Sequence, residues 1–308
     1  MWTTFKYEPF KDENFDYVAQ NGSDVFSQGV IRVSPSECVL PAAYMEIALK
    51  IKNFKVYEDD IWVVSFPKCG SSLTREMVWL LMKDLDFQTA RNVDLVDRFP
   101  CLEFNSILLR IPEVSYAVDL CDRMERPRFI MSHLPVELLP DGLWTVKPKV
   151  IYVGRNPKDT AVSLYNHYKL TSHYSGTMEG FMNAFLGNVI FYTPYWNHVL
   201  GFWKKRGESH LLFNTVEEMK QCLQEIIKRT ADFLGKRLTD QEVNMLMEHL
   251  ETFQSLRRFT GLRIAASGED PLGTGNDDVD GRLTPDMLAR FDRWSEESLQ
   301  GTGYTGPV

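Results

Sequence analysis

The chain has 308 residues, of which 44% are hydrophobic and 25% are charged, a composition typical of a globular protein with a sizeable core. Its formal net charge of −8 argues against a general affinity for nucleic acid or for an anionic membrane, so an anionic ligand must be held by specific groups. The five cysteines show no CxxC spacing, which argues against a disulfide framework or a zinc site and favours free thiols in a reducing compartment.

The amino end, "MWTTFKYEPFKDENFDY", is polar and aromatic, unlike a signal peptide or a transit peptide. No apolar run approaches the ~18 residues of a membrane-spanning helix. We therefore expect a cytoplasmic protein without membrane contact. A single domain is expected over residues 1–308, with residues 1–40 as an N-terminal extension on the substrate side.

Short apolar segments alternate with amphipathic segments along the middle of the chain. This alternation predicts an α/β fold in which helices flank a parallel sheet. The predicted strands are residues 61–66, 128–132, 149–155 and 210–214.

Helix signals follow these strands. The segment 74–85 has helical periodicity, and another helix is expected to begin near Asp159. Two later helices begin with capping boxes and a third with an N-cap threonine followed by proline, and Gly235 is expected to end the first of them. These starts are Thr215 with Glu218, Thr239 with Glu242, and Thr284 with Pro285. The Gly- and Asp-rich segment 265–281 predicts a long irregular loop or lid.

The stretch between the first strand and its helix, "FPKCGSS", has the composition of an anion-binding loop. Lys68 supplies a charge, Gly70 permits close backbone approach, and Ser71 and Ser72 supply hydroxyl donors at the amino end of a helix. The magnesium-binding Ser/Thr that follows the lysine of ATP and GTP loops is absent, because Cys69 stands there. An ordinary turn with a surface lysine is the alternative.

Two further polar residues follow predicted strands. His133 comes directly after the strand 128–132, and Arg155 ends the strand 149–155. Because parallel strands end at one edge of a sheet, both should lie on the side of Lys68. An imidazole can accept a proton at neutral pH, and a guanidinium offers a fork for phosphate. A structural histidine and a surface ion pair are the alternatives.

The segments "FPKCGSSLTREMVW", "RFIMSHLPVELLP" and "VIYVGRNPKDTAVSLYNHY" together resemble the cytosolic sulfotransferases, in matching order and approximate spacing. "CGSS", "LDFQTARNVDLVDRFPCLEF" and "PYWNHVLGFWKKR" are similar to arthropod members. The resemblance implies a P-loop-like sulfotransferase fold with a five-stranded parallel sheet. It also implies 3′-phosphoadenosine 5′-phosphosulfate (PAPS) as the sulfuryl donor, without a metal.

The resemblance also assigns roles to individual residues. It implies that His133 is the general base and that Lys68 contacts the bridging oxygen of the leaving group. Ser71 and Ser72 would bind the 5′-phosphate, and Arg155 and Ser163 the 3′-phosphate. The remaining nucleotide-binding positions would be Cys69, Gly70, Leu73 and the adenine-contacting Phe253.

Several positions depart from the family pattern. Leu73, Met131 and Val216 stand where the family has tryptophan, lysine and tyrosine. The carboxy-terminal Arg-Lys-Gly is replaced by the acidic "PLGTGNDDVDG", which weakens the expected hold on the 3′-phosphate. Nearby arginines at 257, 258, 263 and 282 are candidate substitutes. The family's dimerisation motif is also missing, with Asp280, Pro285 and Ala289 at its positions, so we expect a monomer or a different dimer.

The resulting prediction is sulfuryl transfer from PAPS to a hydroxyl of a small acceptor in small-molecule metabolism or detoxification. An aromatic or apolar acceptor is suggested by Phe99, Phe104, Tyr168, Phe185 and Phe191. Two alternatives stay open. One is a protein that binds PAPS or its desulfated product PAP with little transfer activity. The other is a dehydratase acting through transient sulfation.

Overall fold

A computed structural model describes residues 5–9, 11–22, 29–104, 117–171, 174–265 and 283–308, without the side chains of residues 256–265. The segment expected to form a loop or lid lies outside the described residues from position 266 onward. None of the described helices combines the length and the hydrophobicity needed to cross a bilayer.

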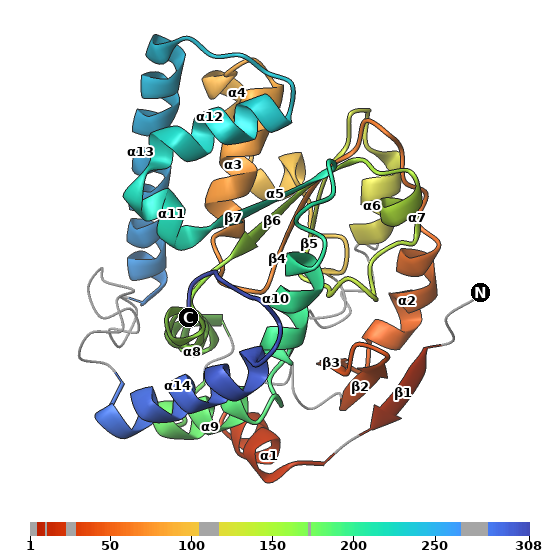
Figure 1. The fold of residues 1–308 in the computed structure, drawn as a ribbon, viewed down its shortest axis with the longest axis vertical. Coiled ribbons are helices and arrows are strands. Elements are labelled where there is room, and N and C mark those ends of the chain that lie inside the picture. Colours follow the sequence, from red (N-terminus) through yellow and green to blue (C-terminus); the bar gives the residue numbers. More distant parts are fainter. Residues whose placement is uncertain (1–4, 10, 23–28, 105–116, 172–173, 266–282) are drawn as a thin grey trace.

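A parallel sheet forms the centre of the molecule (Figure 1). Its strands lie in the order β5-β4-β6-β7, and each agrees with a predicted strand to within one residue. Residues of β4 are buried on both faces, with Trp62 and Val64 on one and Ile61 and Val63 on the other. A strand covered on both faces reads as a continuous apolar run, as observed here. The bounds are β4 (Ile61–Ser65), β5 (Phe129–Ser132), β6 (Lys149–Gly154) and β7 (Leu211–Thr215).

The expected fifth strand is not formed in the described part of the chain, where the parallel sheet has four strands. Beside β5, a single parallel bridge joins Cys101 to Met131. The Met131 N–H donates to the Pro100 carbonyl at 2.9 Å, and the Leu102 N–H donates to the Met131 carbonyl at 2.8 Å. Proline has no N–H to continue a ladder, which limits the pairing on this side.

Helices cover the two faces of the sheet as separate layers (Figure 1). One layer contains α3 (Ser71–Met82), α12 (Leu223–Phe233) and α13 (Asp240–Ala265). The other contains α8 (Pro157–Thr171), α9 (Met178–Leu186), α10 (Tyr195–Trp203) and α14 (Pro285–Leu299). The three-layer arrangement confirms the predicted α/β class.

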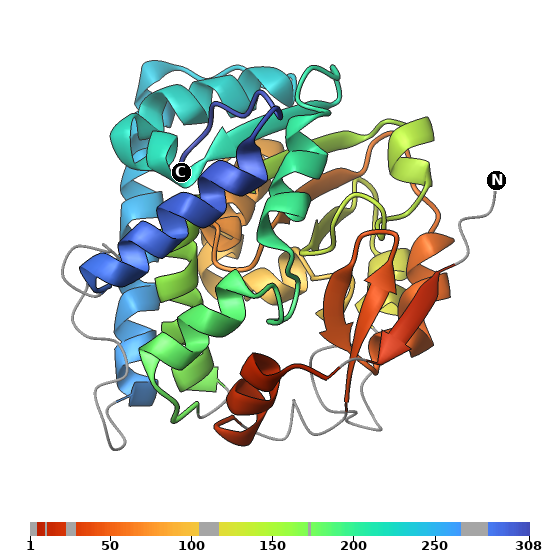
Figure 2. The same ribbon diagram turned by 60° about the horizontal axis from the view of Figure 1, so that its bottom comes forward.

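A second, antiparallel sheet forms at the amino end (Figure 2). Its strands are β1 (Lys6–Pro9), β2 (Val30–Ser34) and β3 (Cys38–Pro41), followed by α2 (Tyr44–Lys52). Val39 bonds to the main chain far along the sequence: its N–H donates to the Thr193 carbonyl at 2.9 Å, and the Tyr192 N–H donates to its carbonyl at 2.7 Å. The N-terminal region therefore packs against the main core.

The predicted helix starts are found, with two differences. The Thr215 and Thr239 capping boxes and the Thr284 N-cap are all formed. The helix expected between Thr215 and Gly235 is divided at Cys222, and α8 begins two residues before Asp159. The shorter helices are α1 (Glu13–Gln20), α4 (Phe87–Asn92), α5 (Leu95–Arg98), α6 (Ala117–Arg123), α7 (Gly142–Thr145) and α11 (Val216–Gln221).

Candidate active site

The site lies at the carboxyl edge of the parallel sheet, between β4 and β6. These neighbouring strands send their helices to opposite faces, α3 to one layer and α8 to the other. The crevice at such a switch of direction is where open α/β sheets bind ligands. The β4–α3 loop, residues 66–70, enters it from β4, and Arg155 enters it directly after β6.

The β4–α3 loop has a left-handed backbone at two positions. Lys68 has φ 69° and Gly70 has φ 84°. A Cβ on Gly70 would lie 2.8 Å from Val216 Cγ2 and 3.2 Å from Met219 Cε, so only glycine fits without a shift. Turns that alternate right-handed and left-handed residues direct backbone N–H groups into an anion-binding concavity.

The first turn of α3 leaves its N–H groups available. Gly70 is the N-cap and supplies no capping side chain. The first bond across the turn joins the Thr74 N–H to the Gly70 carbonyl at 3.1 Å, so the N–H groups of residues 71–73 face the loop. Ser71 is buried and Ser72 half-buried at this end. The arrangement suits a phosphate or sulfate group.

Arg155 joins the two sides of the crevice. Its side chain is buried, and Nη1 donates to the Lys68 carbonyl at 3.0 Å. Nη2 lies 3.9 Å from Asp159 Oδ2, and Nε has no partner among the described residues. A buried guanidinium with an unused N–H fits an anion that completes its hydrogen bonds.

The other expected nucleotide-binding residues flank this loop. Ser163 is buried on α8. Leu73 and Phe253 pack against the same hydrophobic cluster, and α13, which carries Phe253, packs against both α3 and α8. The structure thus places Leu73 and Phe253 against one cluster on the α3 side and Ser163 on α8, without a described contact that joins Ser163 to the loop.

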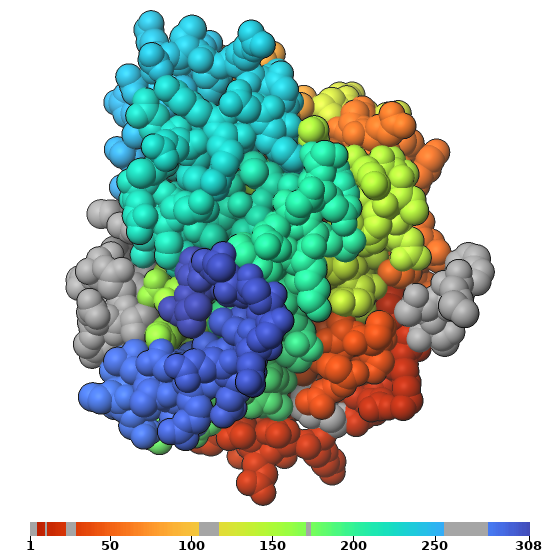
Figure 3. Space-filling model, viewed as in Figure 1, coloured from red at the N-terminus to blue at the C-terminus, as the bar shows by residue number. Residues whose placement is uncertain are grey.

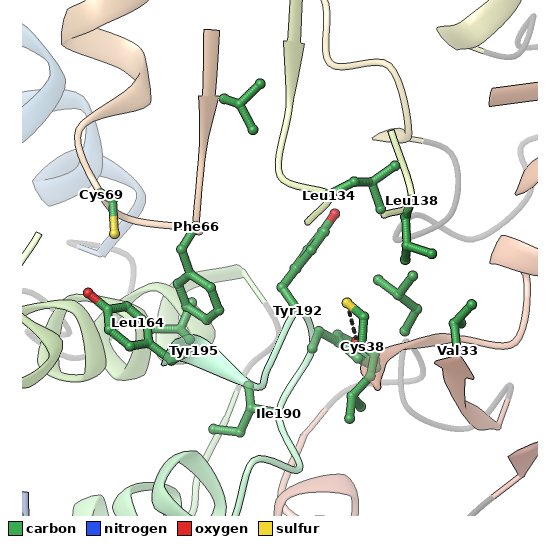
Figure 4. Packing of buried hydrophobic residues seen from close by; sticks show 14 of the residues in the cluster. Val33, Cys38, Phe66, Cys69, Leu134, Leu138, Leu164, Ile190, Tyr192 and Tyr195 are labelled. Atoms are coloured by element: carbon green, nitrogen blue, oxygen red, sulfur yellow. Dashed lines mark hydrogen bonds between the residues drawn. The ribbon is translucent and has the colours of Figure 1, made fainter. Parts of the chain in front are cut away.

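Cys69 has a structural place in the loop. Its Sγ lies 3.4 Å from Thr160 Oγ1, and burial raises the pKa of the thiol to about 12. Figure 4 shows Cys69 directed toward the buried cluster beneath the loop, where Phe66 points toward Tyr195. The thiol therefore ties the loop to α8 as a neutral packing group.

His133 is half-buried at the end of β5, next to the end of β4. Its Nδ1 lies 2.7 Å from the Ser65 carbonyl oxygen. A carbonyl can only accept a hydrogen bond, so Nδ1 must carry the proton and the lone pair of the neutral ring is on Nε2. Ser65 is three residues from Lys68, so the imidazole and the β4–α3 loop share one edge of the sheet.

The surroundings of His133 favour the neutral ring. Burial lowers the pKa of His133 to about 3, with the Ser65 carbonyl acting in the opposite direction and Arg75 contributing further repulsion. The protonated form is thus disfavoured before ligands bind, which keeps the ring neutral but also makes it a weaker base than a solvent-exposed imidazole.

Two hydrogen-bonding groups and one aromatic ring around His133 were not anticipated from the sequence. Glu103 accepts the His133 N–H at 2.7 Å, and His198 Nε2 lies 2.9 Å from the His133 carbonyl. Tyr192 packs edge-on against the imidazole, with ring centroids 5.6 Å apart. Glu103 follows an apolar segment and His198 sits within a helical pattern, so neither has a local signal of proximity to His133.

The departures from the family pattern have visible consequences. Met131 is buried in the cluster on the α3 side, and Val216 fills the space beside Gly70. The candidate substitute arginines lie where side chains are not described. Among the described residues, no cluster of three or more His, Cys, Asp or Glu side chains is arranged to hold a metal.

The aromatic residues expected near an acceptor do not form one group. Tyr168, Phe185 and Phe191 are buried in the cluster on the α8 side, near the crevice. Phe99 instead packs against Phe129 in the opposite layer, and Phe104 is exposed. Phe99 is therefore a core residue.

Known proteins have sequences similar to this one. The family model described as "Sulfotransferase domain" matches residues 58–303. Luciferin sulfotransferase of Photinus pyralis is 30% identical over 324 residues, covering 96% of this chain and 87% of the relative. Sulfotransferase 4A1 of Homo sapiens is 34% identical over 202 residues, covering 65% of this chain and 68% of the relative.

Solved structures share the fold. Retinol dehydratase, crystallised with androsterone and the inactive cofactor PAP, has a TM-score of 0.87 at 24% identity, over 100% of this chain and 99% of that one. A mouse sulfotransferase complexed with PAP has a TM-score of 0.64 at 23% identity, over 86% of this chain and 92% of that one. The predicted resemblance is confirmed: the chain belongs to the sulfotransferase family, whose members are PAPS-dependent enzymes.

Proposed function

We propose that this enzyme transfers the sulfuryl group of PAPS to a hydroxyl of a small apolar or aromatic acceptor, with His133 as the general base and Lys68 at the leaving oxygen. The backbone N–H groups and hydroxyls of Ser71 and Ser72 hold the 5′-phosphate. Arg155 and Ser163 hold the 3′-phosphate. Leu73 and Phe253 supply apolar contact to the adenine.

The reaction needs one proton acceptor and one cation on opposite sides of the transferred group. The acceptor oxygen forms a bond to sulfur while its proton moves to His133 Nε2. The bond between sulfur and the bridging oxygen breaks, and the Lys68 ammonium neutralises the charge that develops on that oxygen. Transfers of this kind depend chiefly on positioning and on charge stabilisation.

One observation carries the proposal. The Nδ1 of His133 bonds to the Ser65 carbonyl at 2.7 Å, which assigns the proton-accepting lone pair to Nε2. The position of His133 beside the end of β4 supports an action together with Lys68.

The acceptor class is inferred from the surroundings and the relatives. Tyr168 and Phe191 are buried in the cluster on the α8 side, and Tyr192 packs against the imidazole. Luciferin, retinol and androsterone are named for relatives or structural neighbours, and all three are small organic molecules with a hydroxyl group. A hydroxylated ring or polyene is therefore the acceptor to test first.

The direct test is transfer of labelled sulfate from PAPS to a panel of phenols, sterols and retinol. His133→Ala should reduce kcat by about 10²–10⁴-fold, the usual contribution of a general base, while PAP binding by calorimetry is retained. Lys68→Ala should reduce kcat by about 10²–10³-fold through loss of charge stabilisation. Lys236→Ala, which removes a lysine paired with Asp84 far from the crevice, is the matched control.

Wild-type turnover in both site variants would contradict the proposed mechanism. Tight PAP binding without transfer to any acceptor would favour a nucleotide-binding protein. Product mass separates the two enzymatic outcomes: a retained sulfate ester supports transfer, whereas loss of water without sulfate indicates dehydration through transient sulfation.

A further inference from the structure

We propose that Glu103 is a positioning residue that holds the imidazole of His133 in its catalytic orientation by fixing the backbone of residues 132–134. This inference rests on the proposed role of His133. It assigns a function to a buried carboxylate that bonds to the turn carrying the imidazole.

The single bridge beside β5 determines where Glu103 lies. Cys101 is paired in parallel with Met131. Two residues further along both segments, Glu103 is therefore opposite His133. The rudimentary fifth strand delivers a carboxylate to the turn that carries the imidazole.

Both carboxylate oxygens of Glu103 accept hydrogen bonds from this turn. Oε1 accepts the His133 N–H at 2.7 Å, and Oε2 accepts the Ser132 hydroxyl at 2.8 Å. The Ser132 oxygen in turn accepts the Leu134 N–H at 3.1 Å, so its own proton must be directed at Glu103. Three successive residues are thus linked to one carboxylate.

The carboxylate of Glu103 is fully buried, and burial of a charged group costs free energy. Glu103 is 0% exposed, and burial raises its pKa, although the bonds from His133 and Ser132 act in the opposite direction. A buried carboxylate is tolerated only when its hydrogen bonds are satisfied. The hydroxyl of Tyr192, 3.4 Å from Oε1, adds a third and longer contact.

Tyr192 supports the same arrangement. Its backbone has φ 72°, an uncommon conformation for a residue with a large side chain. The bond of its N–H to Val39 in β3 holds it there, and its ring packs on the imidazole. Strained backbone of this kind persists where surrounding contacts fix it and is concentrated at functional sites.

A second brace acts on the other side of His133. His198 Nε2 donates to the His133 carbonyl at 2.9 Å, since a carbonyl only accepts. Its Nδ1 then accepts the Tyr152 hydroxyl at 3.0 Å. With the N–H held by Glu103 and the carbonyl held by His198, the ring can reach the Ser65 carbonyl in one orientation.

The test separates positioning from general stability. Glu103→Ala leaves the His133 N–H and the Ser132 hydroxyl without their acceptor, so the turn should relax. We expect kcat to fall by about 10²-fold, as for a misplacement of about 1 Å, with the PAP dissociation constant near wild type. Glu103→Gln keeps one acceptor oxygen and should lower kcat by only about tenfold, the value of one hydrogen bond.

The matched control is Asp60→Asn. Asp60 is another carboxylate with 0% exposure, and it accepts Arg128 Nε at 2.8 Å and Nη2 at 2.7 Å. It directly precedes β4, at the opposite end of the strand from His133. This variant should lower the melting temperature without lowering kcat. A kcat of Glu103→Ala no lower than that of Asp60→Asn would overturn the proposal.

A spectroscopic readout reports the orientation directly. In ¹⁵N-histidine NMR spectra of the wild type, the His133 ring should show a protonated Nδ1 and an unprotonated Nε2. Glu103→Ala should show a mixture of tautomers. If that variant does not fold, Glu103→Gln decides alone, and an unchanged kcat with an unchanged tautomer overturns the proposal.

Failure here is distinct from failure of the proposed function. Full turnover by His133→Ala would remove the catalytic role of His133 itself. An inactive His133→Ala beside a fully active Glu103→Ala would remove only the positioning role. Parallel loss of kcat and PAP affinity in Glu103→Ala would also contradict positioning.

Discussion

At the scale of single residues, the proton-accepting property of His133 depends on its surroundings. A solvent-exposed imidazole titrates near pH 6.5 and exchanges between two tautomers. Burial lowers the pKa of His133 to about 3, and the Ser65 carbonyl selects the tautomer. The nearby His198 is similar, because burial lowers its pKa to about 4. Two neutral imidazoles with opposite tautomers therefore lie beside each other at neutral pH.

This environment predicts the behaviour of the two rings in an acid titration of the free protein. Because their pKa values are lowered, the ¹⁵N resonances of His133 and His198 should stay constant from pH 8 to pH 5. The same rings in urea should titrate near pH 6.5. A midpoint near 6.5 for His133 in the folded protein would contradict the buried neutral ring.

The lowered pKa values of His133 and His198 also determine how the free energy of unfolding changes with pH. Below pH 6.5 the unfolded chain takes up protons that the folded His133 and His198 do not accept. Their contribution to the free energy of unfolding therefore falls with decreasing pH, by about 1.4 kcal/mol per pH unit for each group until the folded pKa is reached.

At the scale of elements, the β4–α3 loop is shaped by contact with α11. Val216 and Met219 lie so close to Gly70 that a Cβ there would overlap Val216 Cγ2. The loop is thus held against α11 while the amino end of α3 stays open. Val216, which stands where the family has tyrosine, limits the space beside Gly70 and so restricts the conformation of the loop.

Gly70→Ala should therefore weaken nucleotide binding. The added methyl displaces the loop, and lost charge-assisted hydrogen bonds of roughly 1.5–3 kcal/mol each should lower PAP affinity by about tenfold or more in calorimetry. Gly235→Ala is the matched control, because Gly235 has φ 73° but open space around it. It should cost about 1 kcal/mol of stability and leave PAP affinity unchanged. Equal PAP affinity in both variants would contradict a loop shaped by Val216.

Elements with local signals were predictable from the sequence. The four parallel strands are apolar runs, and the helices after Thr215, Thr239 and Thr284 have caps encoded within four residues. The edge position of His133 and Arg155 follows from the direction of parallel strands.

The rest depends on pairing between distant segments. The place of Glu103 is set by the register of Cys101 on Met131, and no local pattern encodes that register. The resemblance implied a fifth strand, but in the described part of the chain a single bridge forms there. His198 reaches His133 through helix packing across 65 residues of sequence, which periodicity alone cannot reveal.

At the scale of the whole molecule, β3 and the C-terminal segment both bond to residues near the carboxyl edge of the parallel sheet. Val39 of β3 bonds to residues 192 and 193, beside the imidazole. In the C-terminal segment, the Val308 carbonyl accepts a hydrogen bond of 2.6 Å from Nδ2 of Asn156, the residue that follows Arg155. Figure 3 shows the C-terminal segment lying against the region of α10. Tyr304 packs there against Trp196 and Trp203, with ring centroids 5.4 and 4.8 Å away.

Tyr304→Ala tests whether this segment supports the nucleotide site. Loss of the aromatic contacts should lower the free energy of unfolding by about 3 kcal/mol in urea titrations. PAP affinity should also fall, because Asn156 loses the segment that holds it beside Arg155. Tyr304→Phe keeps the ring and should preserve both properties. A destabilised Tyr304→Ala with unchanged PAP affinity would limit the segment to a structural role.

The bond between Asn156 and Val308 spans 152 positions of sequence, and that between Arg155 and Lys68 spans 87. During synthesis on a ribosome, residues 61–215 can assemble the sheet long before the segment that closes over its edge has emerged. The β4–α3 loop can therefore form early in synthesis. The contacts of the C-terminal segment with Asn156, beside this loop, form last. Contacts between such distant residues are slow to form, so the support of the loop by the C-terminal segment should follow assembly of the sheet.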